Sequence, residues 1–327
     1  MNTHNVVMMA LVLAVAMPGM AADDPKPATA SATTQEARRN TVVGFSQIGA
    51  ESAWRTAQTE SFRAEAAKRG ITLILSDAQQ RQASQIKAVR NFIAQGVDAI
   101  ILSPVMKSGW EPVLREAKAA GIPVIVVERP IDVSDPSLYV TVVGPDFVEE
   151  GRIAGRWLAK ALKGKGNIAE LRGTTGSAPA IDRGKGFREE LDKHPDLRII
   201  MSETGDFTRS KGKEVMEAFL RSGKKIDALY AHNDDMALGA IQAIEEAGQK
   251  PGTDIIVVSI DGVKAAFEAM VAGKLNATVE CTPELGPPAF DAVEAIVAGK
   301  LVPKEIHPEE RLFEQSQAKD LIDSRKY

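Results

Sequence analysis

Residues 71–105, ITLILSDAQQRQASQIKAVRNFIAQGVDAIILSPV, have the pattern of one complete strand, helix and strand in succession. A short apolar run is followed by a polar turn, and from Ile86 to Ile93 apolar residues recur at the spacing of one helix face. Gly96 then supplies a helix stop, and a second apolar run begins at Ala99. Two strands joined through a helix lie parallel with a right-handed crossover, so this stretch predicts a parallel α/β sheet.

The same alternation continues on both sides of this unit. The expected strands are 41–46, 71–76, 99–102, 124–127, 168–171, 197–202, 228–231 and 255–260, and the expected helices are 52–69, 83–95, 110–120, 147–162, 180–191, 210–220, 236–247 and 263–272. An extended crossing at 139–143 separates two such series. With 327 residues, 44% of them hydrophobic, the chain is long enough for two domains with separate cores. We therefore expect two doubly wound α/β lobes.

The N-terminus has the pattern of a secretory signal peptide. An apolar run at 6–17 precedes Pro18 and small residues, and it is shorter than the roughly twenty residues of a membrane span. We expect cleavage near residue 21 or 22, a disordered polar leader over 23–40, and a periplasmic location.

Charge and cysteine content narrow the classes of partner. The formal net charge of -4 and the lack of a basic stripe argue against nucleic acid. Cys281 is the only cysteine, so no intramolecular disulfide can form and no cysteine near the cleavage region can carry a lipid. We expect a free, monomeric protein.

Candidate ligand-binding residues follow the expected strands, because a parallel sheet binds ligands at the carboxyl ends of its strands. Carboxylates, amides and guanidinium groups suit a sugar, whose hydroxyls both donate and accept, and aromatic faces suit its C–H side. An Asp at a strand end could instead cap a helix, and Trp54 could belong to the core. The candidates are Glu51, Trp54, Arg55, Asp77, Ser103, Glu128, Arg129, Arg183, Phe207, Asn233, Asp261 and Glu280.

The sequence lacks a recognisable catalytic constellation. Its four histidines are dispersed without zinc-type spacing, and neither a G-x-S-x-G elbow nor a phosphate-binding P-loop motif occurs. The run from Gly173 to Gly176 could hold an anion, although a tight turn is the favoured interpretation. A hydrolase using Glu51, Asp77 or Glu280 as acid and base is the enzymatic alternative. We expect no enzyme activity, no cofactor and no metal.

Several phrases together resemble the periplasmic sugar-binding proteins of the ribose/galactose type, and within them the galactofuranose branch. The resemblance covers nearly all of 41–298. Its phrases are GFSQIGAESAWR (44–55), SDAQQRQASQIKAVRNFIAQGVDAIILSPV (76–105), GWEPVLREAK (109–118), AIDRGKGF (180–187), GDFTRSKGKEVMEAF (205–219), AHNDDMALGAIQAI (231–244) and SIDGV (259–263).

The resemblance implies the type I periplasmic binding protein fold, with two Rossmann-like lobes joined by three crossing segments and no cofactor. It implies a first lobe of 41–143 plus 281–310 and a second of 144–280 plus 311–327. The stretch 51–55 is distinctive of the galactofuranose branch. Where the family usually has Asp-Arg, this chain has Glu128-Arg129. The implied sugar contacts are Arg129, Arg183, Phe207, Asn233 and Asp261, with Ser103 and Glu280 as further candidates.

The expected function is the extracytoplasmic sugar-binding component of an ABC importer, which closes around a monosaccharide and meets a membrane permease. Galactofuranose or a related furanose or pyranose is the expected ligand. The alternatives are a sugar sensor for a receptor and a binder of ribose or arabinose. A sugar-responsive transcription regulator would need an N-terminal helix-turn-helix, where this chain has an apolar leader.

Overall fold

The computed structural model describes residues 40–327. The expected signal peptide, and the expected leader up to residue 39, lie outside these residues. Within the described part of the chain, every helix is too short or too polar to cross a bilayer.

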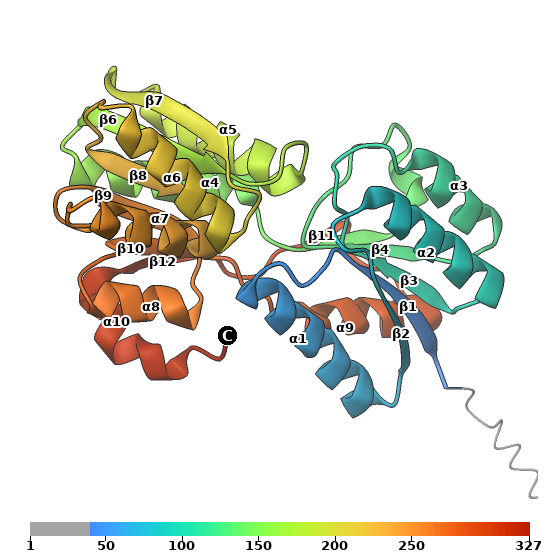
Figure 1. Ribbon diagram of the computed structural model, residues 1–327. Coiled ribbons are helices and arrows are strands. Elements are labelled where there is room, and N and C mark those ends of the chain that lie inside the picture. The colour runs from blue at the N-terminus through green and yellow to red at the C-terminus, as the bar shows by residue number, and fades with distance from the viewer. Residues whose placement is uncertain (1–39) are drawn as a thin grey trace, which may run out of the picture. The chain divides into compact units, whose positions relative to one another are not determined.

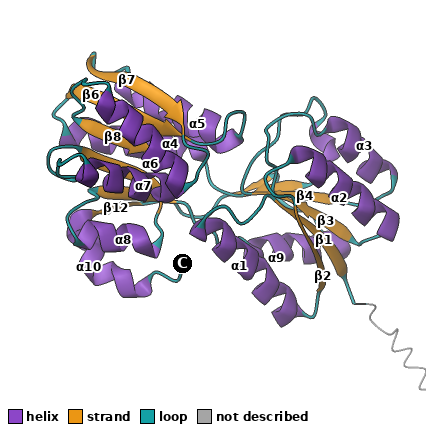
Figure 2. Ribbon diagram, viewed as in Figure 1, coloured by secondary structure: helices purple, strands orange, loops and turns teal. Residues whose placement is uncertain are grey.

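The described chain forms two six-stranded sheets, each covered by helices (Figures 1 and 2). The first has the order β11-β5-β4-β3-β1-β2, and all of its strands are parallel. Its strands are β1 (Val42–Gln47), β2 (Thr72–Asp77), β3 (Ala99–Leu102), β4 (Val124–Val127), β5 (Thr141–Val143) and β11 (Glu305–Ile306).

The second sheet repeats this arrangement, with the order β12-β10-β9-β8-β6-β7. Only β12 departs from the parallel direction, since it pairs antiparallel with β10. The strands are β6 (Lys165–Arg172), β7 (Asp196–Thr204), β8 (Ala228–Ala231), β9 (Ile256–Asp261), β10 (Ala277–Glu280) and β12 (Leu312–Glu314).

Helices cover both faces of each sheet, so the central strands are continuous apolar runs, as expected for buried parallel strands. On the first sheet, α1 and α9 pack on one face, and α2 and α3 on the other. On the second sheet, α4 packs against α5 and α6 against α7, while α8 contacts α10. The helices are α1 (Ala53–Arg69), α2 (Gln82–Gln95), α3 (Glu111–Ala119), α4 (Phe147–Ala161), α5 (Ala178–Leu191), α6 (Arg209–Arg221), α7 (Asp234–Glu246), α8 (Lys264–Val271), α9 (Gly286–Val297) and α10 (Gln315–Leu321). Two short 3-10 turns, Pro136–Leu138 and Ile322–Ser324, complete the elements.

The chain passes between the two sheets three times. These passages run from β5 to α4, from β10 to α9 and from β11 to β12. Because each passage starts or ends beside the carboxyl end of a strand, all three border the space where the two sheets face each other.

The predicted α/β fold class with two parallel-sheet lobes is confirmed. One local expectation needs correction, because the stretch expected to be an extended crossing contains β5, which pairs with β4 and β11. The crossing itself follows this strand, at 144–146.

Candidate functional site

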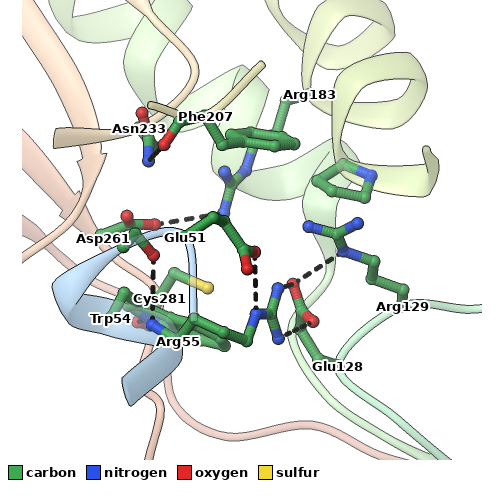
Figure 3. A pocket seen from close by; sticks show the side chains of 12 residues that line it. Glu51, Trp54, Arg55, Glu128, Arg129, Arg183, Phe207, Asn233, Asp261 and Cys281 are labelled. Carbon is green, nitrogen blue, oxygen red and sulfur yellow. Dashed lines mark hydrogen bonds and ion pairs between the residues drawn. The ribbon is translucent and has the colours of Figure 1, made fainter. Parts of the chain in front are cut away.

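A cavity with about 300 Å³ of empty space lies between the two lobes, at the carboxyl ends of both sheets (Figure 3). Its lining consists of Glu51, Ser52, Trp54, Arg55, Glu128, Arg129, Pro179, Arg183, Phe207, Asn233, Asp261 and Cys281.

Contacts across the cleft show that the lobes are closed around this cavity. The indole Nε1 of Trp54 donates a hydrogen bond to the backbone oxygen of Cys281. At the start of α1, the amide of Ala53 donates to Oδ2 of Asp235 at 3.4 Å. Trp54 belongs to helix α1 of the first lobe, yet its side chain packs in the core cluster of the second lobe.

The start of α1 supplies the first wall. Ser52 caps the helix by accepting a hydrogen bond from the Arg55 amide at 3.2 Å, so Glu51 precedes the helix while Arg55 lies in its first turn. Nε of Arg55 lies 3.2 Å from Oε1 of Glu51. Oε2 of Glu51 is buried and has no hydrogen-bond partner among the described residues. A buried carboxylate oxygen left without a donor is costly, so a ligand hydroxyl would stabilise it.

The residues after β4 supply a second wall. Glu128 has a positive φ of 63°, and it receives hydrogen bonds from both Arg55 and Arg129. Burial opposes ionisation of Glu128, but the charges of Arg129 and Arg55 outweigh it and lower the pKa of this carboxyl to about 2. Glu128 therefore stays ionised throughout the physiological range.

Arg129 keeps donors free for a ligand. Its Nε donates to Glu128 at 3.1 Å and its Nη1 to the backbone oxygen of Val105 at 3.4 Å. Its Nη2 makes no hydrogen bond with any described residue, although the residue is only 4% exposed. Guanidinium N–H groups that have no protein acceptor are donors that sugar hydroxyl oxygens can satisfy.

Arg183 and Asp261 face the cavity from the second lobe. Arg183 lies on α5 and donates from Nε to Oε2 of the buried Glu150 at 2.7 Å, and from Nη1 to the backbone oxygen of His232. Its Nη2 is 3.7 Å from Oδ1 of Asp261, which is beyond hydrogen-bond distance. The Asp261 carboxyl receives no hydrogen bond from the described residues, and burial raises its pKa well above the usual value.

Phe207 and Asn233 complete the second lobe's wall. Asn233 caps α7 through its Oδ1, which accepts from the Met236 amide at 3.0 Å, while its Nδ2 donates to the Phe207 backbone oxygen at 3.2 Å. The Phe207 ring lies 5.4 Å from the Arg129 guanidinium carbon. Trp54 and Phe207 thus provide apolar surfaces among groups that are otherwise charged or polar.

Most of the expected site residues lie in this lining. The nine that do are Glu51, Trp54, Arg55, Glu128, Arg129, Arg183, Phe207, Asn233 and Asp261. Three residues, Asp77, Ser103 and Glu280, do not, and each has another partner. Asp77 is the last residue of the edge strand β2, is exposed and accepts from the Gln79 amide at 2.7 Å.

Ser103 and Glu280 lie behind the lining rather than in it. Ser103 is fully buried and donates to Oε2 of Glu128 at 3.1 Å. The Glu280 carboxylate accepts from Arg311 and Arg325, each at 2.8 Å. Both side chains therefore support the wall without facing the cavity.

Three lining residues are absent from the sequence-based set, namely Ser52, Pro179 and Cys281. Ser52 lies inside the stretch 51–55, so its position between expected residues could have indicated it. Pro179 lies one helical turn before Arg183, so helix spacing could have indicated Pro179. Cys281 directly follows β10, where the neighbouring Glu280 was the expected residue.

The arrangement can bind a polar ligand, with acceptors on Glu51 and Asp261, donors on Arg129 and Asn233, and two aromatic faces. No cluster of potential metal ligands occurs among residues 40–327.

Comparisons with known proteins agree with this arrangement. The family model described as a periplasmic binding protein domain matches residues 43–301. The galactofuranose-binding protein YtfQ of Escherichia coli (strain K12) is 53% identical over 289 residues, which covers 87% of this chain and 91% of that protein.

Two solved structures of similar proteins contain furanose sugars. The binding component of the arabinose ABC transporter from Shewanella sp. ANA-3, bound to α- and β-L-arabinofuranose, is 53% identical with a TM-score of 0.86, covering 88% of this chain and 96% of that one. A protein from Mycobacterium smegmatis in complex with β-D-fucofuranose is 50% identical with a TM-score of 0.86, covering 88% and 95% of the two chains.

Proposed function

The chain belongs to the periplasmic binding protein family, and on that basis we propose that it binds a monosaccharide in the furanose form and delivers it to an ABC importer. The family consists of solute-binding proteins and not of enzymes. In this proposal the chain is exported to the periplasm as a monomer, releases its N-terminal signal peptide and meets a membrane permease.

The observation that carries the proposal is the set of unfilled hydrogen-bonding groups in the closed cavity. Oε2 of Glu51 is buried without a hydrogen-bond partner, and the carboxyl of Asp261 and Nη2 of Arg129 likewise make no hydrogen bonds with the described residues. Leaving a buried group such as Oε2 of Glu51 unpaired costs about 1 to 3 kcal/mol. A small polyhydroxylated molecule would satisfy donors and acceptors together, and the relatives whose structures contain arabinofuranose and fucofuranose indicate the ring form.

Ligand binding would act on the equilibrium between an open and a closed form. Glu51 and Arg129 belong to the first lobe, whereas Arg183 and Asp261 belong to the second. A sugar that contacts both sets stabilises only the closed form, so it shifts the lobes toward closure. A permease that recognises the closed form would thereby distinguish loaded from empty protein.

Calorimetric titration of the refolded, ligand-free mature protein with L-arabinose, D-galactose, D-fucose, D-ribose and D-fructose tests the proposal. We expect micromolar binding of at least one of the first three. NMR of the bound, ¹³C-labelled sugar should then show a furanose anomeric signal, although pyranose forms dominate in free solution. A bound pyranose would contradict the ring form, and the absence of binding by any of these sugars would contradict the proposal.

Replacing Arg129 by Ala tests the site. The change should abolish binding detectable by calorimetry while the protein stays folded, because Glu128 keeps its bonds to Arg55 and Ser103. Unchanged affinity in this variant would exclude Arg129 from sugar binding.

A further inference from the structure

The carboxylate of Glu128 is fully occupied by protein donors. Oε1 accepts from Nη2 of Arg55 at 3.2 Å and from Nε of Arg129 at 3.1 Å. Oε2 accepts from Nη1 of Arg55 at 2.6 Å and from Oγ of Ser103 at 3.1 Å. A carboxylate offers about four lone-pair sites, so these four hydrogen bonds leave none for a ligand hydroxyl.

The two guanidinium groups on Glu128 differ in what remains free. Arg55 is also engaged by Glu51, by Ser103 and by Oε1 of Gln58, the last at 2.6 Å. Arg129 uses only Nε and Nη1, and its Nη2 has no acceptor among the described residues. Arg55 therefore anchors Glu128, while Arg129 keeps more of its N–H groups free for a ligand.

The backbone holds Glu128 in this position. Its φ of 63° lies in the left-handed region, which side-chain-bearing residues rarely adopt. Gly144, in the adjacent crossing segment, packs so closely that a Cβ there would lie 2.6 Å from the Glu128 backbone oxygen. Because the backbone is confined, the length of the side chain determines whether the carboxylate reaches Arg55 and Arg129 together.

We infer that Glu128 is a positioning residue that fixes the Arg129 guanidinium against the sugar and does not itself contact the ligand. The inference rests on the proposed sugar-binding function and assigns Glu128 a role within that site. It contrasts Glu128 with Glu51, which lines the same cavity but keeps one oxygen unpaired.

A double-mutant cycle tests this role, with Glu128→Gln measured in the wild-type and Arg129→Lys backgrounds. Lysine keeps the positive charge but lacks the Nε–H group that binds Glu128. In the wild-type background, Glu128→Gln should weaken sugar binding at least about tenfold, because it removes charge-assisted hydrogen bonds that orient Arg129. In the Arg129→Lys background, the same change should weaken binding less than about threefold, because no guanidinium remains to be positioned.

An equal loss in both backgrounds would overturn the inference, since a direct contact from Glu128 to the sugar does not depend on Arg129. Unchanged affinity of Glu128→Gln in the wild-type background would also overturn it. Should Glu128→Gln fail to fold, Glu128→Asp, which keeps the charge but is shorter, can replace it in the same cycle.

The matched control is Glu116→Gln, which removes one charge from an exposed ion pair with Arg90, also in the first lobe. This variant should bind sugar with unchanged affinity. The wild-type titration separates the two proposals. If the wild type binds no sugar, the proposed function fails. If the wild type binds sugar but the losses of affinity in Glu128→Gln and Arg129→Lys are additive, only the role of Glu128 is contradicted.

Discussion

The Nζ atom of Lys107 lies 2.8 Å from both carboxylate oxygens of Asp182, across the cleft between the lobes. Lys107 follows β3 in the first lobe, whereas Asp182 lies on α5 in the second. The backbone amide of Lys107 also donates to the backbone oxygen of Gly176 at 3.1 Å. Since these bonds join the two lobes, they stabilise the closed form and not either lobe alone.

Replacing Lys107 by Met should weaken sugar binding about two- to fivefold, because a partly exposed ion pair contributes up to about 1 kcal/mol. The loss should appear mainly as faster dissociation, measured by stopped-flow fluorescence, and it should shrink at high salt. Lys211→Met is the control, because Lys211 pairs with Glu214 within helix α6, at 2.7 Å. A wild-type dissociation rate in Lys107→Met would show that the Lys107–Asp182 ion pair does not stabilise the closed form.

Gly173 leaves room for the Phe207 ring. A Cβ at this position would lie 1.8 Å from Cζ of Phe207, so the ring must move if the glycine is replaced. Gly173→Ala should therefore weaken sugar binding by at least about tenfold, which corresponds to roughly 1.4 kcal/mol of lost contact with the ring. Calorimetry measures the effect, and thermal melting checks that the protein remains folded.

Phe207→Ala provides the comparison for this prediction. It should weaken binding by a similar factor, and the double variant should lose little more than either single variant, because both changes remove the same wall. Additive losses would mean that Gly173 acts by a route other than the Phe207 ring.

The repeated strand and helix units were predictable because their signals are local. The helix expected at 83–95 ends at Gly96, which adopts the left-handed φ of 62° that suits glycine as a helix cap. Strand β10 and helices α9 and α10 were not among the predicted elements, and neither were the strands β5, β11 and β12. The last three are runs of two or three residues, which are too short to show a period. They are held by pairing with strands distant in sequence.

The sequence pattern identifies residues at the ends of strands, and these include most of the site. It does not give the position of each strand in its sheet, which decides whether such a residue lines the cavity. Asp77 and Asp261 both end a strand, yet only Asp261 lines the cavity. β2 is the edge of its sheet, whereas β9 lies between β8 and β10. This difference arises from tertiary pairing, so a local pattern of strand followed by Asp could not distinguish the two residues.

Glu280 shows a second limit of local pattern. The sequence places it at the end of an apolar strand, but its carboxylate turns to Arg311 and Arg325, which come from the C-terminal part of the chain. The next residue, Cys281, then faces the cavity. Neighbouring residues of an extended chain point to opposite sides. Since Arg311 and Arg325 bind the Glu280 side chain on one side, the Cys281 side chain points to the other side, where the cavity lies.

Asp234 should make the stability of the protein depend on pH. It is fully buried and joins α7 to β9, β10 and the start of α8 through Ser259, Thr278 and the Val263 amide. Burial raises the pKa of Asp234 to about 6. The folded protein therefore holds this proton more tightly than the unfolded chain, in which the pKa of Asp is about 3.9.

The resulting contribution to stability is present below about pH 4 and is lost as the pH rises through about 6, a loss of roughly 2 to 3 kcal/mol. Asp234→Asn cannot ionise, so the stability of the wild type relative to this variant should fall over that range. Urea unfolding of both proteins across these pH values measures the difference. Parallel stability profiles would show that Asp234 does not titrate as its burial predicts.

Cys281 should report closure through its reactivity. It is the only cysteine in the chain, it is 2% exposed in the closed form, and burial raises the pKa of its thiol well above the usual value. A buried, protonated thiol reacts slowly, whereas opening of the cleft would expose this part of the cavity wall to solvent. Saturating sugar should therefore slow the reaction with Ellman's reagent at least about tenfold, if the closed form predominates only when ligand is bound.

The Arg129→Ala variant serves as the control for this experiment, because it should react at the same rate with and without sugar. Denatured protein should release one equivalent of thionitrobenzoate, since the chain has one cysteine. Equal rates for the wild type with and without a sugar that it binds would mean that Cys281 stays covered when the lobes separate. In that case the segment after β10 would move with the second lobe, and the opening would have to occur on the side of the cavity formed by Glu51 and Arg129.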